Sequence, residues 1–452
     1  MKNQNFFFKL RIFLFVALLS VGCVVGFLTF LRPTVSESEG RPLTTFPTFT
    51  LKSFLSGDYT SQVSLWYSDS YPGRDTMLDI NGDLKSLYGI HSVSFEGGDV
   101  EADTIDPNEE FTLPEFTTRP PEDDPETEEG KETDTGFEEE TAPTEGQVIN
   151  GFYAEGNTGY ELYYFNKDLT DRYINVVTQI ALDLDGLATV YDMVVPAACC
   201  YGLSPEKTAD LGASNGFEGI NYMYSRLAAY SALLQEEGRL TNPIVTLDVG
   251  DALGAHYENE YIFYRTDHHW TGLGAYYASR FFLDKVGRTY PALDYYTEVE
   301  VGSFLGSLYR HTQSEILKKN PDTTYAYKTP SVQTITIYKD GEYREAPLID
   351  ENVTSSNKYL CFSGGDVAYY EMHNENITDG SKILIIKESY ANAFMPMLVD
   401  SYEYVYAVDY RFWRDDLASF VRDNEIDTVL FLNYLVCTVD DYSVRSIEKL
   451  VK

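Results

Sequence analysis

The sequence predicts an α/β fold in which a mainly parallel sheet carries helices on both faces. After residue 147, short apolar and β-branched runs alternate with longer stretches whose apolar residues recur at helical spacing. Several of the short runs are apolar throughout, which is typical of parallel strands buried on both faces. In sheets of this class, functional residues cluster at the carboxyl ends of the strands.

The expected elements follow one another in the order of a βαβ chain. A hairpin is expected first, from strands at residues 150–153 and 162–165. We then expect helices at 169–184, 220–237, 271–286 and 415–423, and strands at 188–196, 244–249, 261–265, 383–386, 402–408 and 428–432. Gly238 ends the second helix, and Thr271 is the expected N-cap of the third.

Composition limits the possible partners. A content of 43% hydrophobic and 15% aromatic residues indicates a folded body, and 452 residues suffice for one large domain or two ordinary ones. The formal net charge of −37 argues against nucleic acid as a partner, because nucleic-acid binding requires a basic surface. We therefore expect no nucleic-acid function.

The N-terminus predicts a membrane anchor. Residues 12–31 form a run of twenty uncharged residues that follows Lys2, Lys9 and Arg11. Such a run is long enough to cross a bilayer as a helix, and the preceding basic residues favour a cytoplasmic N-terminus. Residues 1–32 are thus expected to hold the main domain outside the cell membrane. A cleaved signal peptide, or a lipoprotein modified at Cys23, remains an alternative.

The rest of the chain divides into three expected parts. Residues 33–98 should form a structured N-terminal segment that packs on the main domain. Residues 99–147 hold 19 acidic and two basic side chains, which is −17 of the total charge, and nearly lack large apolar residues. Such a stretch cannot bury enough surface to offset its chain entropy, so we expect a disordered insert or linker. The main domain should cover 148–452.

The cysteines indicate neither a zinc site nor a required disulfide. Cys23 lies in the predicted span, and the remaining four show no CxxC spacing, so the pattern does not indicate a structural zinc site. Adjacent Cys199 and Cys200 end an apolar run and are most simply buried thiols.

Two strand ends carry residues suited to nucleophilic catalysis. Asp267 and His269 follow the expected strand at 261–265, and alternation in an extended chain puts them on one face and His268 on the other. A carboxylate beside an imidazole is the base and orienting group of a hydrolase-type triad. Ser389 follows the apolar strand at 383–386 and precedes a helix-like segment, where backbone N–H groups would meet a developing oxyanion. Ser389 as a simple N-cap is the alternative.

These two segments resemble a known bacterial family. Residues 264–271 (YRTDHHWT) resemble the signature of the DHHW protein family, and residues 385–392 (IIKESYAN) look like its second block. The family is similar to the SGNH-hydrolase-like domains of the alginate O-acetyltransferases. The resemblance implies a flavodoxin-like α/β fold in which Ser389 is the nucleophile, His269 the general base and Asp267 the group that orients it. Position 388 is Glu, where the common family pattern has Asp.

Four further residues are candidates for the oxyanion or substrate site. Asn433 would donate a hydrogen bond there or cap its strand, and Arg411 would bind an anionic group or pair with an acid. Trp270 would stack on a sugar or lie in the core, and His268 would contact substrate or pack. A metal site using Asp267, His268, His269 and perhaps His256 is an alternative, although side chains that alternate along a strand do not readily share one ion.

The expected function is O-acetyl transfer to a cell-envelope or exported polysaccharide by an exported, membrane-anchored protein. Ser389 would carry the acyl group, and the resemblance implies a membrane-bound O-acyltransferase partner as the source of acetyl. Deacetylation by the same triad, with water as the acceptor, remains open. So does a non-catalytic envelope scaffold or glycan-binding module, with which the 37 tyrosines are consistent. No metal or other cofactor is expected.

Overall fold

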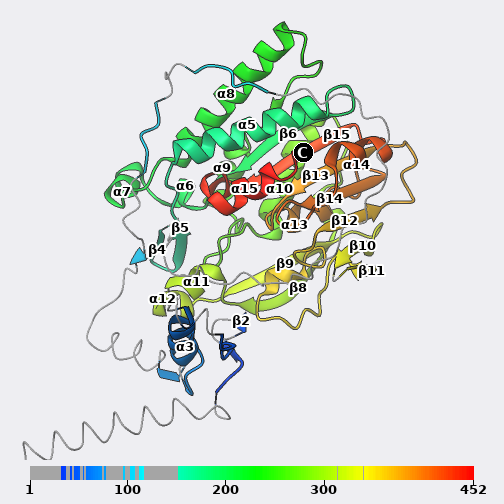
Figure 1. Cartoon of the computed structure of the whole chain (residues 1–452). Helices are drawn as coiled ribbons and strands as arrows, with labels where there is room; N and C mark the ends of the chain where they lie inside the picture. Colours follow the sequence, from blue (N-terminus) through cyan, green and yellow to red (C-terminus); the bar gives the residue numbers. More distant parts are fainter. Residues whose placement is uncertain are drawn as a thin grey trace, which may run out of the picture. The chain divides into compact units, whose positions relative to one another are not determined.

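The computed structural model describes residues 32–36, 41–42, 45–50, 54, 58–73, 76–77, 95–96, 102–106, 111–116, 151–312, 314–339 and 341–451 (Figure 1). The predicted membrane span at 12–31 lies outside these ranges. Within them, no helix combines the length and the apolar character needed to cross a bilayer. The chain forms two compact units, Met1–Ser92 with Thr135–Ala142, and Val93–Asp134 with Pro143–Lys452.

Among its described residues, the smaller unit holds a short hairpin and a helix. Strand β1 (Val35–Ser36) pairs antiparallel with β2 (Arg41–Pro42), and helix α3 covers Asp58–Asp69. The guanidinium of Arg32 lies 3.6 Å from the ring centroid of Trp66 and donates to the Trp66 carbonyl at 2.9 Å. The packing of segment 33–98 on the main domain stays a prediction.

The larger unit is built on one eight-stranded sheet. Its strands lie in the order β11 (Glu342–Pro347), β10 (Thr334–Lys339), β12 (Tyr369–His373), β14 (Tyr404–Asp409), β13 (Lys382–Lys387), β15 (Thr428–Tyr434), β6 (Thr189–Val195) and β7 (Val245–Thr246). The last five strands in this order run parallel.

The expectation of a mainly parallel sheet is wrong, because the sheet is mixed. Strands β12, β10 and β11 each pair antiparallel with their neighbours. None of these three strands was expected from the sequence. In β11 every residue is at least partly exposed, so it lacks the continuous apolar run that marks a buried parallel strand. Short antiparallel strands joined by a hairpin need no crossover helix and can extend a parallel sheet at its edge.

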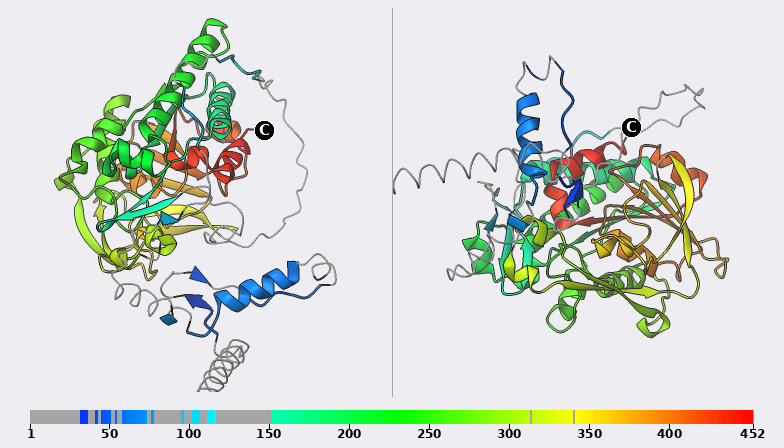
Figure 2. Two further views of the ribbon diagram at one scale, coloured as in Figure 1. Left: turned by 90° about the vertical axis from the view of Figure 1, so that its left-hand side faces the viewer. Right: turned by 90° about the horizontal axis from the view of Figure 1, so that it is seen from below.

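Helices cover both faces of this sheet, as expected, and side-chain alternation divides the core in two (Figures 1 and 2). In β13, Ile383 and Ile385 belong to one core, whereas Leu384 and Ile386 belong to the other. The first core includes α10 (Gly272–Val286) and α13 (Ala391–Phe394). The second is covered by α5 (Lys167–Asp183), α8 (Gly216–Glu236), α14 (Leu417–Asp423) and α15 (Asp441–Glu448).

The remaining elements surround the sheet. Strand β4 (Phe152–Glu155) pairs with β5 (Thr158–Glu161), so the expected hairpin forms with its second strand earlier in the chain, and β3 (Phe95–Glu96) extends it. A second hairpin joins β8 (Thr297–Phe304) to β9 (Asp322–Lys328). The short helices are α6 (Cys199–Gly202), α7 (Pro205–Asp210), α9 (Gly250–Tyr257), α11 (Ser307–Thr312) and α12 (Glu315–Lys318).

Segments 102–106 and 111–116 of the acidic stretch pack within the larger unit, although disorder was expected across 99–147. The main-chain N–H of Asp103 donates to the Phe165 carbonyl at 2.8 Å, and Arg239 donates to the Phe116 carbonyl at 2.9 Å. The Phe111 ring meets Tyr230 edge-on, with 5.4 Å between centroids. Hydrogen bonds to the main chain and an aromatic contact therefore attach segments 102–106 and 111–116. Residues 117–147 lie outside the described ranges.

The four cysteines in the described part of the chain are all free thiols. Cys199 and Cys361 are buried, and Cys200 and Cys437 are half-buried. Burial raises the pKa of the Cys361 thiol, so the protonated form dominates at neutral pH.

Candidate active site

Ser389 lies where the central strand β13 ends, two residues before helix α13. Its side chain is only 7% exposed. It is not the N-cap of α13, since Tyr390 occupies that position in helical geometry. The strand-to-helix turn predicted from the sequence therefore places the Ser389 hydroxyl at the carboxyl edge of the parallel strands.

Asp267 and His269 lie in a loop between α9 and α10, not at the end of a strand. The expected strand at 261–265 is reduced to one antiparallel bridge between Phe263 and Trp270. The main-chain N–H of His269 donates to Asp267 Oδ1 at 3.0 Å. An Asp that accepts a hydrogen bond from the residue two positions on bends the chain, because the side chain imitates a backbone turn. This bend replaces the extended conformation that the alternation argument assumed.

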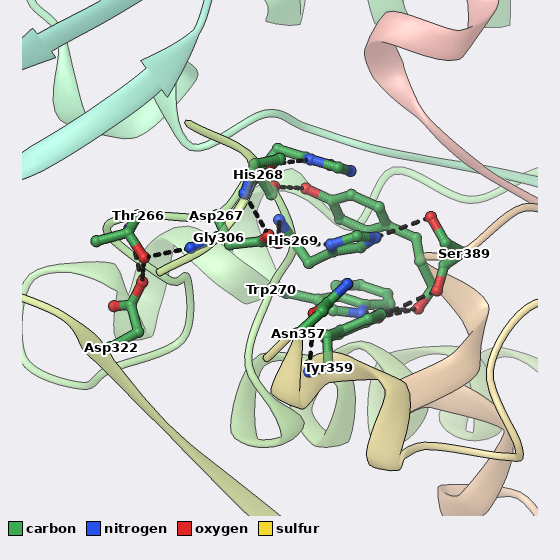
Figure 3. A network of polar contacts seen from close by, with 12 residues as sticks. Thr266, Asp267, His268, His269, Trp270, Gly306, Asp322, Asn357, Tyr359 and Ser389 are labelled. Carbon is green, nitrogen blue, oxygen red and sulfur yellow. Dashed lines mark hydrogen bonds and ion pairs between the residues drawn. The ribbon is translucent and has the colours of Figure 1, made fainter. Parts of the chain in front are cut away.

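A second carboxylate, that of Asp322, holds the loop between α9 and α10. Asp322, at the start of β9, accepts hydrogen bonds from the main-chain N–H groups of Arg265 at 2.9 Å and Thr266 at 2.6 Å. The Thr266 hydroxyl contacts the same carboxylate and accepts the Gly306 N–H at 3.0 Å (Figure 3). Burial raises the pKa of Asp322, and these hydrogen bonds oppose that shift. The loop is thus fixed at both ends, since Thr271 caps α10 as the sequence predicts.

The structure brings Asp267, His269 and Ser389 into one hydrogen-bonded row (Figure 3). His269 Nδ1 lies 2.6 Å from Asp267 Oδ1, and His269 Nε2 lies 2.8 Å from Ser389 Oγ. Burial alone would raise the pKa of Asp267, but the charge and hydrogen bond of His269, with smaller contributions from His268 and Arg310, hold that pKa well below its usual range. A carboxylate that stays ionised fixes the tautomer of His269, which leaves Nε2 to accept the serine proton.

A third carboxyl group contacts the nucleophilic turn. Glu388 Oε2 accepts the Tyr390 N–H at 2.9 Å and lies 3.1 Å from Ser389 Oγ, while Oε1 accepts the Tyr434 N–H at 3.1 Å. Glu388 thus ties the turn after β13 to the end of β15. Burial raises its pKa, and the hydrogen bonds from the two main-chain N–H groups work in the opposite direction. Glu in place of the common Asp therefore still anchors the turn.

Tyr359 supports both the imidazole and the serine loop. Its ring lies against that of His269, with 3.9 Å between centroids and 16° between planes. Its hydroxyl donates to the main-chain carbonyls of Ser389 and Tyr390, each at 3.1 Å. Tyr359 is fully buried, and this burial raises its pKa well above the usual range, so the phenol remains a donor.

Most of the chain matches one protein family. A family model described as "DHHW protein" matches residues 39–117 and 123–408. The chain belongs to the DHHW protein family. A search of curated proteins finds no match.

Solved structures share the fold of this DHHW family member. A DHHW family protein from Eubacterium siraeum matches with a TM-score of 0.56 and 29% identity, covering 66% of this chain and 94% of that one. PatB1 from Bacillus cereus matches with a TM-score of 0.51 and 17% identity, covering 65% of this chain and 99% of that one. A second PatB1 structure, with a sulfonyl adduct, matches at 15% identity and the same TM-score.

Trp270 is not placed to stack on a sugar in this DHHW family member. Its side chain is fully buried, and its indole N–H donates to the Tyr390 carbonyl at 2.9 Å. The ring also stacks on Phe394, with 6.2 Å between centroids. The core alternative considered from the sequence is therefore the one that the structure supports, and Trp270 connects the histidine loop to the serine loop.

Asn433 and Arg411 are also engaged elsewhere, so their proposed substrate roles are corrected. The Asn433 amide is fully buried and donates to the Tyr173 hydroxyl of α5 at 3.1 Å. Arg411 Nη2 contacts Asp409 at 2.7 Å and Asp366 at 3.0 Å, which is the salt-bridge alternative. Arg411 follows the end of β14 as expected, whereas Asn433 lies inside β15, one residue before its end. In neither case does the position along the strand decide which way the side chain points.

His268 packs beside His269 and does not point away from it. The two ring centroids lie 3.9 Å apart, because the turn at Asp267 breaks the alternation of side chains. Asp267, His268 and His269 each offer a potential metal-ligand atom within 4.8 Å of the others, so the alternation argument against a metal site fails. However, Nδ1 of His268 contacts Ser307 and both nitrogens of His269 are engaged by Asp267 and Ser389. These partners favour the triad. His256 instead contacts Glu260 on the surface.

Four supporting residues were missed by the sequence analysis: Gly306, Ser307, Asp322 and Tyr359. The main-chain N–H of Ser307 donates to Asp267 Oδ2 at 2.9 Å, and Gly306 leaves no room for a side chain beside Asp267. These residues lie outside the two family segments quoted above. A single tyrosine among 37 carries no local signal of its role.

Proposed function

We propose that this protein is an acyltransferase that works through an acyl-serine intermediate. The observation that carries the proposal is the 2.8 Å contact between His269 Nε2 and Ser389 Oγ, with Asp267 on the other imidazole nitrogen. A nucleophile, a base within hydrogen-bond reach and an orienting carboxylate are the geometric requirements of nucleophilic acyl transfer.

Each proton in the proposed reaction has a defined position. Ser389 Oγ attacks the acyl carbonyl carbon while its proton passes to His269 Nε2, and the leaving group departs with that proton as the ester forms. In the second step an acceptor hydroxyl attacks the ester carbonyl, its proton passes to Nε2, and the proton then returns to Ser389 as the acyl group leaves. Asp267 stabilises the imidazolium in both steps through Nδ1–H.

The finer proposal is O-acetyl transfer to a cell-envelope or exported polysaccharide. It is supported by the membership of the chain in the DHHW family and by the resemblance of that family to alginate O-acetyltransferase domains. PatB1, which shares the fold, has been obtained with a sulfonyl adduct. Residues 12–31 support a membrane anchor outside the described residues, and a membrane-bound O-acyltransferase is the proposed source of acetyl.

The test measures the acyl-serine directly. The full-length chain, purified in detergent, is mixed with 4-nitrophenyl acetate, and the nitrophenolate burst is followed together with intact mass. The wild type should show a burst and gain the mass of one acetyl group on the peptide that contains Ser389, and Ser389→Ala should lose both. Ser446→Ala is the matched control, since this serine is also buried but lies in α15.

Acceptor choice then separates transfer from hydrolysis. Oligosaccharides added to the acetylated protein should be acetylated faster than water releases acetate. Faster release to water in every case would identify an esterase instead. Absence of an acetylated Ser389 in the wild type, or an undiminished burst in Ser389→Ala, would contradict the proposed triad.

A further inference from the structure

Acyl transfer also requires donors for the negative oxygen that forms when Ser389 attacks, and most candidates at this site are already engaged. The Tyr390 N–H, from the residue after the nucleophile, donates to Glu388 at 2.9 Å. The Asn392 amide donates to Asp366 at 2.7 Å, and Asn433 donates to Tyr173. Within the described part of the chain, the Ser389 N–H donates to no protein atom and remains available. One main-chain donor leaves an oxyanion site incomplete, since such sites generally use two or more.

His268 has the free nitrogen that could complete this site. In the described residues its Nε2 has no hydrogen-bond partner, while its Nδ1 lies 2.6 Å from Ser307 Oγ. The imidazole is half-buried, so it is partly open to a ligand. Figure 3 shows the His268 ring beside that of His269, with its free end directed toward the side on which Ser389 lies.

Ser307 determines which nitrogen of His268 carries the proton. Ser307 Oγ accepts the main-chain N–H of His268 at 3.3 Å. Nδ1 of the same residue is the one acceptor for the Ser307 hydroxyl proton among the described residues. If Ser307 donates this proton, Nδ1 is unprotonated and Nε2 carries the hydrogen of the neutral ring. The free nitrogen is then a donor.

The position of His268 is also fixed relative to the reacting groups. Its main-chain carbonyl accepts the Tyr390 hydroxyl, and its ring lies 5.8 Å from that of Tyr434 by centroids. Its charged form would lower the pKa of both Asp267 and Glu388, which places the ring within electrostatic reach of the base and of the nucleophilic turn. Ser307 connects the two histidines, since its N–H donates to Asp267 and its hydroxyl meets His268.

We propose that His268 is a catalytic residue whose Nε2–H, together with the Ser389 N–H, binds the oxyanion of the tetrahedral intermediate. This inference rests on the proposed acyl transfer and adds a second, distinct role within the histidine pair. His269 accepts the serine proton, and His268 donates a hydrogen bond to the acyl oxygen. The ligand chemistry is that of an ester carbonyl that becomes an alkoxide.

Two substitutions at His268 separate the effect of its Nε2 donor from the effect of its packing. In His268→Asn the amide reaches the Nδ1 position and keeps a contact with Ser307, but the Nε2 donor is lost. In His268→Gln the amide reaches the Nε2 position and keeps a donor there. Single-turnover acetylation of Ser389 by 4-nitrophenyl acetate is measured for both, together with the KM of the steady-state reaction and the melting temperature.

Removing one oxyanion donor typically lowers the chemical rate about 100- to 1,000-fold, so we expect that loss in His268→Asn with little change in KM. His268→Gln should retain a rate within about tenfold of the wild type, as expected for one preserved donor. A boronic acid that forms a tetrahedral adduct on Ser389 provides a second readout. Its affinity should fall in His268→Asn by a factor similar to that in the rate, because only the adduct occupies the oxyanion site.

The outcomes distinguish this inference from the proposed function. If the wild type is acetylated on Ser389 and His268→Asn reacts within threefold of it, the His268 role is wrong and the triad stands. Equal impairment of both variants with unchanged boronic acid affinity would also overturn the oxyanion role. If the wild type forms no acyl-serine and no adduct, the proposed function itself fails, and the His268 inference with it.

Discussion

The imidazole of His269 lies almost parallel to the phenol ring of Tyr359, with 3.9 Å between the ring centroids. The same tyrosine donates a hydrogen bond to the Ser389 carbonyl at 3.1 Å. One buried side chain on a 3-10 turn, Lys358–Cys361, therefore positions two residues that are 120 positions apart in the chain. Tyr359 contacts the His269 ring and the main chain of the serine loop, so it is a positioning residue.

Tyr359→Phe and Tyr359→Leu should differ in their effects on activity. Phe keeps the ring stack and loses the hydrogen bonds to two carbonyls, so we expect a loss of about 1–2 kcal/mol in unfolding free energy and a rate within about tenfold of the wild type. Leu also removes the stack, so the acetylation rate should fall further, by about 100-fold, because small displacements of a base are costly. Urea unfolding and the burst assay measure the two effects. A wild-type rate in Tyr359→Leu would show that the stack does not position His269.

Gly306→Ala should disable the site through Asp267. A Cβ at position 306 would overlap the Cβ and Oδ2 of Asp267 and come within 2.7 Å of its Cα. Because Asp267 must move, its contact with His269 Nδ1 should lengthen, and the acetylation rate should fall about 100-fold or more. Gly254→Ala is the matched control, since its Cβ would meet nothing closer than Tyr201 Cε1 at 3.4 Å. Equal activity of the two variants would contradict the role of Gly306.

We predict that Asp192 makes the free energy of unfolding depend on pH, independently of the active site. Burial raises the pKa of this fully buried carboxyl to about 7, and the hydrogen bond from Tyr173 opposes the shift. The unfolded value is about 3.9, so between about pH 4 and 7 the folded state binds more protons than the unfolded state. The free energy of unfolding therefore falls as pH rises through this window, by at most about 4 kcal/mol.

Asp192→Asn should remove that part of the pH dependence. The amide oxygen can still accept the Tyr173 hydrogen bond, but it carries no charge above pH 7. Urea unfolding at pH 5 and pH 8 should show a larger loss of stability in the wild type than in the variant. Identical pH dependence in the two proteins would mean that Asp192 is not protonated in the folded state near neutral pH.

Local patterns in the sequence were sufficient for most elements of the parallel half of the fold. The apolar run before Ser389 predicts β13, helical spacing predicts α5 and α8, and Thr271 predicts the start of α10. These features depend on residues within a few positions of one another, so they can be read without knowing the fold. The family segments at 264–271 and 385–392 likewise identify the residues that meet at the site.

Only the tertiary structure decided how those residues meet. The bend at Asp267 turns His268 toward His269, and strand alternation could not reveal it because the loop is not a strand. Asn433 lies near the end of β15 and Arg411 follows β14, yet Asn433 binds Tyr173, and Arg411 pairs with Asp409 and Asp366.

The residues that support the loop at 266–271 come from elements that are distant in the sequence. Ser307 and Asp322 contact it over separations of about 40 to 56 positions. Hydrogen bonds and ring contacts across such separations depend on the packing of whole elements, which leaves no periodic trace in the sequence. The sequence by itself thus determined the chemistry available at residues 267–269 and 389. The fold determined which distant groups form hydrogen bonds and ring contacts with these residues.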